Sequence, residues 1–214
     1  MRLGGRRCPH HRCRGWGRGA NSQSPNRAGA SQVRPSGTDT QTHTVLVVIT
    51  PPAVHASIGD AITRAVATVF GTMLHRPVRL AETTLAPLAP AATDTQQVIG
   101  SVGFVGRING IVYLSFPEAF SQLATAQILG MSEGEVEMSG PDLVKDVIGE
   151  LTNMTVGGFK NTLSDLGYPC RLTLPVIVRG HHVAVAAVKS AHREIYHFDS
   201  VGHRISADIQ MMPE

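Results

Sequence analysis

A carboxylate and a carboxamide three residues apart, Glu150 and Asn153, have types and spacing that suit a hydrolytic reaction. A rigidly held carboxamide can accept a hydrogen bond from water and donate one to a phosphoryl oxygen, as hydrolysis of an acyl phosphate requires. A carboxylate one helical turn away can pair with a lysine beside the phosphate and so fix how a partner docks. The pair therefore fits an enzyme that acts on the phosphoaspartate of another protein.

Asp146 and Gly157 extend this pair into a longer stripe. On a helix each residue advances by about 100°, so Asp146, Glu150, Asn153 and Gly157 fall within about 60° of one another. Gly157 has no side chain and would allow a partner's backbone to approach closely. The opposite side of the helix is apolar and carries Leu143, Val144, Val147, Ile148, Leu151, Met154 and Phe159. We therefore expect the apolar side to pack on a sheet and the stripe to face solvent.

The elements that must position the stripe can be predicted from apolar periodicity and from turn residues. Pro141 and Asp142 suit the first turn of a helix, and Gly167 and Pro169 end it, which predicts a helix over 141–166. Further helices are expected at 57–74 and 117–129, strands at 45–49, 78–80, 98–105, 110–115, 171–179, 183–189, 194–199 and 204–211, a hairpin turn at 106–109, and loops at 83–96 and 132–140. These elements predict an α+β domain with long helices on one face of a mostly antiparallel sheet.

The first 43 residues differ in composition from the rest of the chain. They hold eight of the 19 Lys and Arg residues, are rich in Gly, Ser and Pro, and show neither helical nor strand periodicity. We therefore predict a disordered basic leader at 1–43, for which RNA or lipid binding stays open, and one folded domain at 44–214. From Asp60 onward eleven basic residues stand against fifteen acidic ones, a net charge of −4. A domain of that charge is not expected to bind nucleic acid.

Cysteine usage and hydropathy predict a cytoplasmic protein. Of three cysteines only Cys170 falls in the predicted domain, so there is no disulfide framework. The longest strongly apolar run, 45–49, is far shorter than the ~20 residues of a membrane span, and the leader lacks the apolar core of a signal peptide. We therefore expect no export and no membrane partner for the folded domain.

Two groups of residues contain metal-ligand types. The first is Cys8, His10, His11 and Cys13 in the leader, and the second is His181, His182, His192, His197 and His203 in the C-terminal third. Neither group has the ligand spacing of a structural zinc site, so we predict no metal site. We interpret Cys170 as a structural thiol, because no histidine lies near it in sequence to activate it.

The stripe resembles the signature of a known family. Asp146-x3-Glu150-x2-Asn153, with Pro175 after 21 intervening residues, looks like the pattern shared by the CheC, CheX and FliY phosphatases. Residues 142–160 are particularly similar to the motif helix of CheX, and the order of elements from about 54 to 211 also fits. The resemblance implies a CheC/CheX-like pseudo-symmetric domain. It also implies a phosphatase that hydrolyses the aspartyl phosphate of a CheY-like response-regulator receiver domain in chemotaxis or two-component signalling.

By this resemblance Glu150 and Asn153 are the catalytic residues. Asn153 would position the hydrolytic water, and Glu150 would contact a lysine of the receiver. Asp146 and Gly157 would belong to the partner-binding surface, Asp146 supporting the helix rather than reacting, and Pro175 would be structural. The protein would need no cofactor of its own, because the Mg2+ belongs to the receiver. The resemblance also implies a homodimer.

An internal comparison favours a single active helix. Residues 60–71 can be aligned with 146–157, and the alignment retains Asp, Ile and Gly. Arg64 and Ala67 occupy the positions of the acid and the amide, so the first helix keeps the periodicity without the chemistry. This pattern favours a CheX-like protein over a CheC-like protein with two sites, although two amphipathic helices can also match by coincidence.

A non-catalytic adaptor is the main alternative function. Glu and Asn three residues apart are common on solvated helices, and the same helix could bind a receiver or a flagellar component without hydrolysing phosphate. Asn153→Ala separates the two hypotheses, because it should lengthen the lifetime of the phosphate only if the protein is an enzyme.

Overall fold

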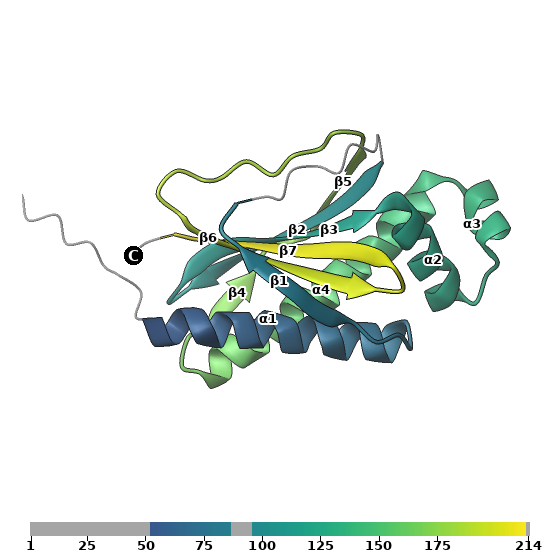
Figure 1. The fold of residues 1–214 in the computed structure, drawn as a ribbon. Helices are drawn as coiled ribbons and strands as arrows, with labels where there is room; N and C mark the ends of the chain where they lie inside the picture. The colour runs from purple at the N-terminus through teal and green to yellow at the C-terminus, as the bar shows by residue number, and fades with distance from the viewer. Residues whose placement is uncertain (1–51, 87–95, 213–214) are drawn as a thin grey trace, which may run out of the picture. The chain divides into compact units, whose positions relative to one another are not determined.

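The computed structural model describes residues 52–86 and 96–212, which form a sheet with helices packed along it (Figure 1). The helices are α1 (Pro52–Met73), α2 (Glu118–Leu129), α3 (Glu133–Ser139) and α4 (Pro141–Asp165). The strands are β1 (Arg79–Thr84), β2 (Gln97–Gly106), β3 (Asn109–Pro117), β4 (Cys170–Leu172), β5 (Val176–Gly180), β6 (His192–Ser200) and β7 (His203–Met212). The predicted leader at 1–43 and the predicted strand at 45–49 lie outside the described residues.

The strand pairings found in the described part of the chain are antiparallel. The strand order is β1-β6-β7-β3-β2-β4, and β5 pairs with β2 next to β4. The predicted hairpin is confirmed, because β2 and β3 pair from Gln97 opposite Pro117 to Phe104 opposite Gly110. These pairings and the long helices confirm the predicted α+β class.

The two long helices, α1 and α4, lie on one face of the sheet and supply most of the helical residues of the core (Figure 1). The buried residues of α4 include Val144, Val147, Ile148, Leu151, Val156, Phe159 and Leu163. Phe159 packs edge-on against Phe104 of β2, with 5.7 Å between the ring centroids. Since each large apolar side chain contributes about 1.5–3 kcal/mol when buried, α4 is held firmly along most of its length.

Some predicted boundaries are wrong. The predicted loop at 132–140 contains α3, whose start is fixed by a capping box between Ser132 and Glu135. The Glu135 carboxylate accepts from the Ser132 N–H at 2.8 Å, and the Ser132 hydroxyl accepts from the Glu135 N–H at 3.3 Å. The predicted strand at 171–179 is divided into β4 and β5, in part because Pro175 has no N–H to donate to a neighbouring strand.

The predicted strand at 183–189 is also wrong, because side chains pair with its backbone in place of a neighbouring strand. Residues 181–191, here named the outer segment, run along the face of the sheet opposite the helices, as the olive trace in Figure 1 shows. The Gln210 side chain accepts from the Val188 N–H at 2.7 Å and donates to the Ala186 carbonyl at 3.1 Å. The alternating Val and Ala residues therefore resemble a strand, but the segment is extended without pairing with a neighbouring strand.

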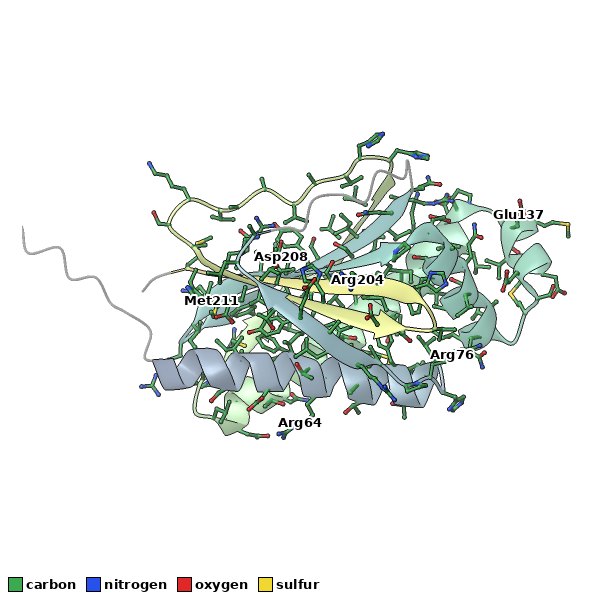
Figure 2. All side chains as sticks on the ribbon, in the orientation of Figure 1. Arg64, Arg76, Glu137, Arg204, Asp208 and Met211 are labelled. Atoms are coloured by element: carbon green, nitrogen blue, oxygen red, sulfur yellow. The ribbon has the colours of Figure 1, made fainter. Side chains whose placement is uncertain are left out.

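A buried ion pair on β6 and β7 also holds the outer segment. Arg193 Nε lies 3.0 Å from a carboxylate oxygen of Asp208, which Figure 2 labels, and both side chains are almost fully buried. The Arg193 guanidinium also donates to the Val185 carbonyl at 3.0 Å. The outer segment is therefore fixed to the side of the sheet away from α4.

His197 makes the stability of the fold depend on pH. Burial lowers the pKa of His197 below its ordinary value of 6.5, although nearby Glu82 acts in the opposite direction. The unfolded chain binds this proton more readily, so the free energy of unfolding should fall as the pH drops below about 6.5. We expect His197→Gln to reduce that slope in urea unfolding between about pH 7.5 and 5.5. Parallel pH dependences for wild type and variant would contradict this assignment.

Candidate functional site

The predicted stripe lies along the exposed side of α4. Asp146, Glu150 and Asn153 are exposed and Gly157 is half-buried. The structure therefore brings these four residues to one face, as the periodicity predicted.

The acid and the amide are available to a partner. Within residues 52–86 and 96–212, no hydrogen bond or ion pair engages the side chain of Glu150 or Asn153. The carboxylate of Asp142, one turn before Asp146, differs because it accepts a hydrogen bond from Lys145 at 2.8 Å. Glu150 and Asn153, like Asp146 beside them, are therefore available to recognise another molecule.

A close approach between α4 and β2 fixes the height of this stripe above the sheet. Thr152, next to Asn153, is buried, and its hydroxyl donates to the Ile148 carbonyl at 2.7 Å. A Cβ added at Gly100 of β2 would lie 2.2 Å from Thr152 Oγ1 and 2.9 Å from Thr152 Cβ. Only glycine leaves room for Thr152 at this distance, so Gly100 is a positioning residue that the sequence pattern did not reveal.

A surface groove of about 750 Å³ begins at Asn153 and lies between α4 and β4. It is lined by Asn153, Met154, Gly157, Gly158, Lys160 and Asn161 of α4 and by Cys170, Arg171 and Leu172 of β4. The sequence analysis did not single out Lys160 or Arg171. The spacing of Lys160, seven residues after Asn153, could have placed it on the stripe, whereas Arg171 reaches the groove only through the tertiary packing of β4.

The cysteine in this groove is not activated. Burial raises the pKa of the Cys170 thiol, and the positive charge of Lys160 only partly offsets this effect. At neutral pH the side chain is therefore a thiol rather than a thiolate, which is the nucleophilic form. This supports the interpretation of Cys170 as a structural thiol and leaves the chemistry to the stripe.

Among the described residues no three His, Cys, Asp or Glu side chains are grouped to hold a metal ion. His181 and His182 are exposed on the outer segment, whereas His197 is buried. The predicted zinc-like group at Cys8–Cys13 lies outside the described residues. The described part of the chain also has no helix long and apolar enough to cross a membrane.

The exposed face of α1 corresponds to the exposed face of α4 but carries different residues. Arg64 and Ala67, aligned with the acid and the amide of α4, are both exposed, and Figure 2 shows Arg64 projecting from the side of α1 away from the sheet. The aligned Asp60 and Gly71 are exposed as well. The described chain therefore contains two similarly placed helices, and one of them carries the acid and amide pair.

Comparison with known proteins points to one family. The family model described as chemotaxis phosphatase CheX matches residues 98–199, which include the stripe and the groove. A comparison with curated protein sequences finds no match.

Solved structures with a similar fold carry related descriptions. A CheC-like superfamily protein from Shewanella sp. PV-4 is 26% identical, with a TM-score of 0.62, over 72% of this chain and 97% of that one. The chemotaxis protein CheX from Vibrio vulnificus is 22% identical, with a TM-score of 0.60, over 72% of this chain and 98% of that one. A chain of the CheX–CheY–BeF3–Mg2+ complex from Borrelia burgdorferi is 18% identical, with a TM-score of 0.58, over 72% and 97% of the two chains.

Proposed function

We propose that this chain is a CheX-like phosphatase that hydrolyses the aspartyl phosphate of a CheY-like receiver domain in chemotaxis or another two-component pathway. The observation that carries the proposal is the placement of Asn153. Its carboxamide is exposed, has no partner within the described residues, and stands at the end of a groove on a firmly packed helix. The family model supports the class of reaction, and the complex with CheY among the similar structures supports the class of partner.

In this reaction Asn153 positions the attacking water. Its carboxamide oxygen accepts a hydrogen bond from the water, and its NH2 group donates to a phosphoryl oxygen. The water oxygen bonds to phosphorus as the bond from phosphorus to the aspartyl oxygen breaks, which yields inorganic phosphate and a free aspartate carboxylate. A rigid helix keeps the water in line at little entropic cost, and this is the main catalytic contribution of the protein.

Glu150 docks the receiver in register with Asn153. It lies about 4.5 Å before Asn153 along the helix axis and on the same face. Without an ion pair among the described residues, its carboxylate is available to a lysine beside the phosphoaspartate. Asp146 and Gly157 complete the partner-binding surface, Asp146 by supporting the helix and Gly157 by permitting close approach.

The remaining parts of the proposal follow the family resemblance. The Mg2+ that neutralises the phosphoryl group comes with the receiver, so the chain needs no metal of its own. The protein acts as a homodimer in the cytoplasm, where two-component receivers are phosphorylated.

The proposal is tested by the lifetime of phosphate on a panel of receiver domains from the same organism. We expect one receiver to lose its phosphate faster when substoichiometric wild-type protein is added, because an enzyme is released after each hydrolysis. If receivers bind but none loses phosphate faster, the protein is an adaptor that uses the same helix.

A further inference from the structure

Charge is unevenly distributed along the exposed side of α4. Asp146 and Glu150 lie toward its N-terminal end, next to α3 with its three exposed glutamates, of which Figure 2 labels Glu137. Lys160 lies toward its C-terminal end, on the same stripe and about 10 Å beyond Asn153 along the axis. Asn153 therefore stands at the boundary between an acidic and a basic half of one surface.

Arg171 of β4 adds a second cation to the basic half. Arg171 is exposed, and it lines the groove together with Lys160. In the described part of the chain, neither cation has an ion pair. Asp165, the acid at the end of α4, projects about 120° away from Asn153 around the helix and does not share this face. The groove therefore presents two uncompensated positive charges.

We propose that Lys160 and Arg171 form a second docking site, which binds an acidic segment of the receiver on the side of the phosphoaspartate away from the lysine that Glu150 contacts. This inference rests on the proposed function. A surface with opposite charges on either side of Asn153 matches a partner that carries lysine on one side of its phosphoaspartate and carboxylates on the other. The wrong orientation places like charges against each other at both ends, so the pattern fixes the direction in which the receiver docks.

The position of Lys160 along α4 favours docking over the chemical step. Its Cα lies about 10 Å beyond that of Asn153 along the axis, two turns from the residue that would hold the phosphoryl group. Both cations are nevertheless close enough to Asn153 to share one interface with it, because each partner contributes about 800 Å² to a standard protein interface. Lys160 and Arg171 should therefore control the affinity and orientation of the receiver much more than its rate of hydrolysis once bound.

The test measures binding and hydrolysis separately with full-length protein. The ligand is each receiver of the panel, loaded with beryllofluoride for calorimetry and phosphorylated for kinetics. The test variant is Lys160→Glu/Arg171→Glu, and its neutral counterpart carries Gln at both positions. Lys189→Glu is the matched control, because it reverses one exposed charge on the outer segment, across the sheet from α4. Thermal unfolding by circular dichroism shows whether each variant is folded.

We expect the double reversal to raise Kd and KM about tenfold at low salt, the neutral variant about threefold, and Lys189→Glu to have no effect. The difference should shrink at high salt, because exposed charges are screened. If the double reversal is unfolded, the neutral variant decides. Equal Kd and salt dependence for that variant and wild type would overturn the docking site, as would the absence of any receiver that binds wild type. Weakened binding without any phosphate loss by wild type would support the docking site and refute the phosphatase.

Discussion

Asn153→Ala is expected to remove most of the phosphatase activity, lowering kcat about a hundredfold or more while the receiver still binds with similar affinity. The alanine can neither hold the water nor donate to the phosphoryl group, whereas Glu150 and the rest of the surface remain. The measurement is single-turnover decay of phosphate on the responding receiver, with Kd for the beryllofluoride-loaded receiver determined in parallel.

Asn161→Ala is the matched control for this variant. Asn161 is also an exposed asparagine of α4 that lines the groove, but it is two turns from Asn153. We expect its kcat to stay within about threefold of wild type, because it lies too far along the helix to reach the same water. Equal phosphate lifetimes with wild type and Asn153→Ala would show that the carboxamide has no catalytic role.

Gly100→Ala is expected to destabilise the fold and to reduce activity at a site that it does not touch. The added methyl group would lie 2.2 Å from Thr152 Oγ1 and 2.9 Å from Thr152 Cβ, so α4 must move away from β2. Overpacking of this kind costs about 1–3 kcal/mol of unfolding free energy. Because Thr152 precedes Asn153, the displacement should also lower kcat. Urea unfolding and phosphate decay measure the two effects.

Two further variants isolate the cause. Thr152→Ala in the Gly100→Ala background removes the clashing atoms and should restore part of the stability and of kcat, which a double-mutant cycle measures as a favourable coupling. Gly71→Ala on the exposed side of α1 has open space around its new methyl group and should be neutral or slightly stabilising. Independent effects of the two substitutions, with no coupling, would contradict the close approach of α4 to β2.

The parts of the fold that were predictable from sequence are those set by local periodicity. The apolar spacing of α4 predicted both its length and which side is buried, because a helix that packs on a sheet must repeat its apolar residues every three to four positions. The β2–β3 hairpin was equally predictable, since two β-branched runs flank a short Gly and Asn turn. The stripe of α4 follows directly from the first of these patterns.

The parts that could not be predicted depend on tertiary packing. The outer segment has the alternation of a strand, but Gln210 and Arg193 supply its hydrogen bonds, and nothing local indicates those partners. The sequence around Arg171 gives no sign of a groove, because Arg171 reaches it only when β4 pairs with β2 beside α4. In sequence Gly100 looks like any glycine in a strand, because its role depends on Thr152, which packs against it only in the folded protein. The α3 helix could have been predicted, because its capping pair, Ser132 and Glu135, can be recognised in the sequence.

The most direct test of the central claim is a count of turnovers. A tenfold excess of the responding phosphorylated receiver is mixed with wild-type protein, and released inorganic phosphate is measured against time. The account predicts that each molecule of the protein releases several phosphates, at a rate well above the receiver's own hydrolysis. Phosphate release no faster than that of the receiver alone, despite measurable binding, would contradict it and make the exposed side of α4 a docking surface without catalysis.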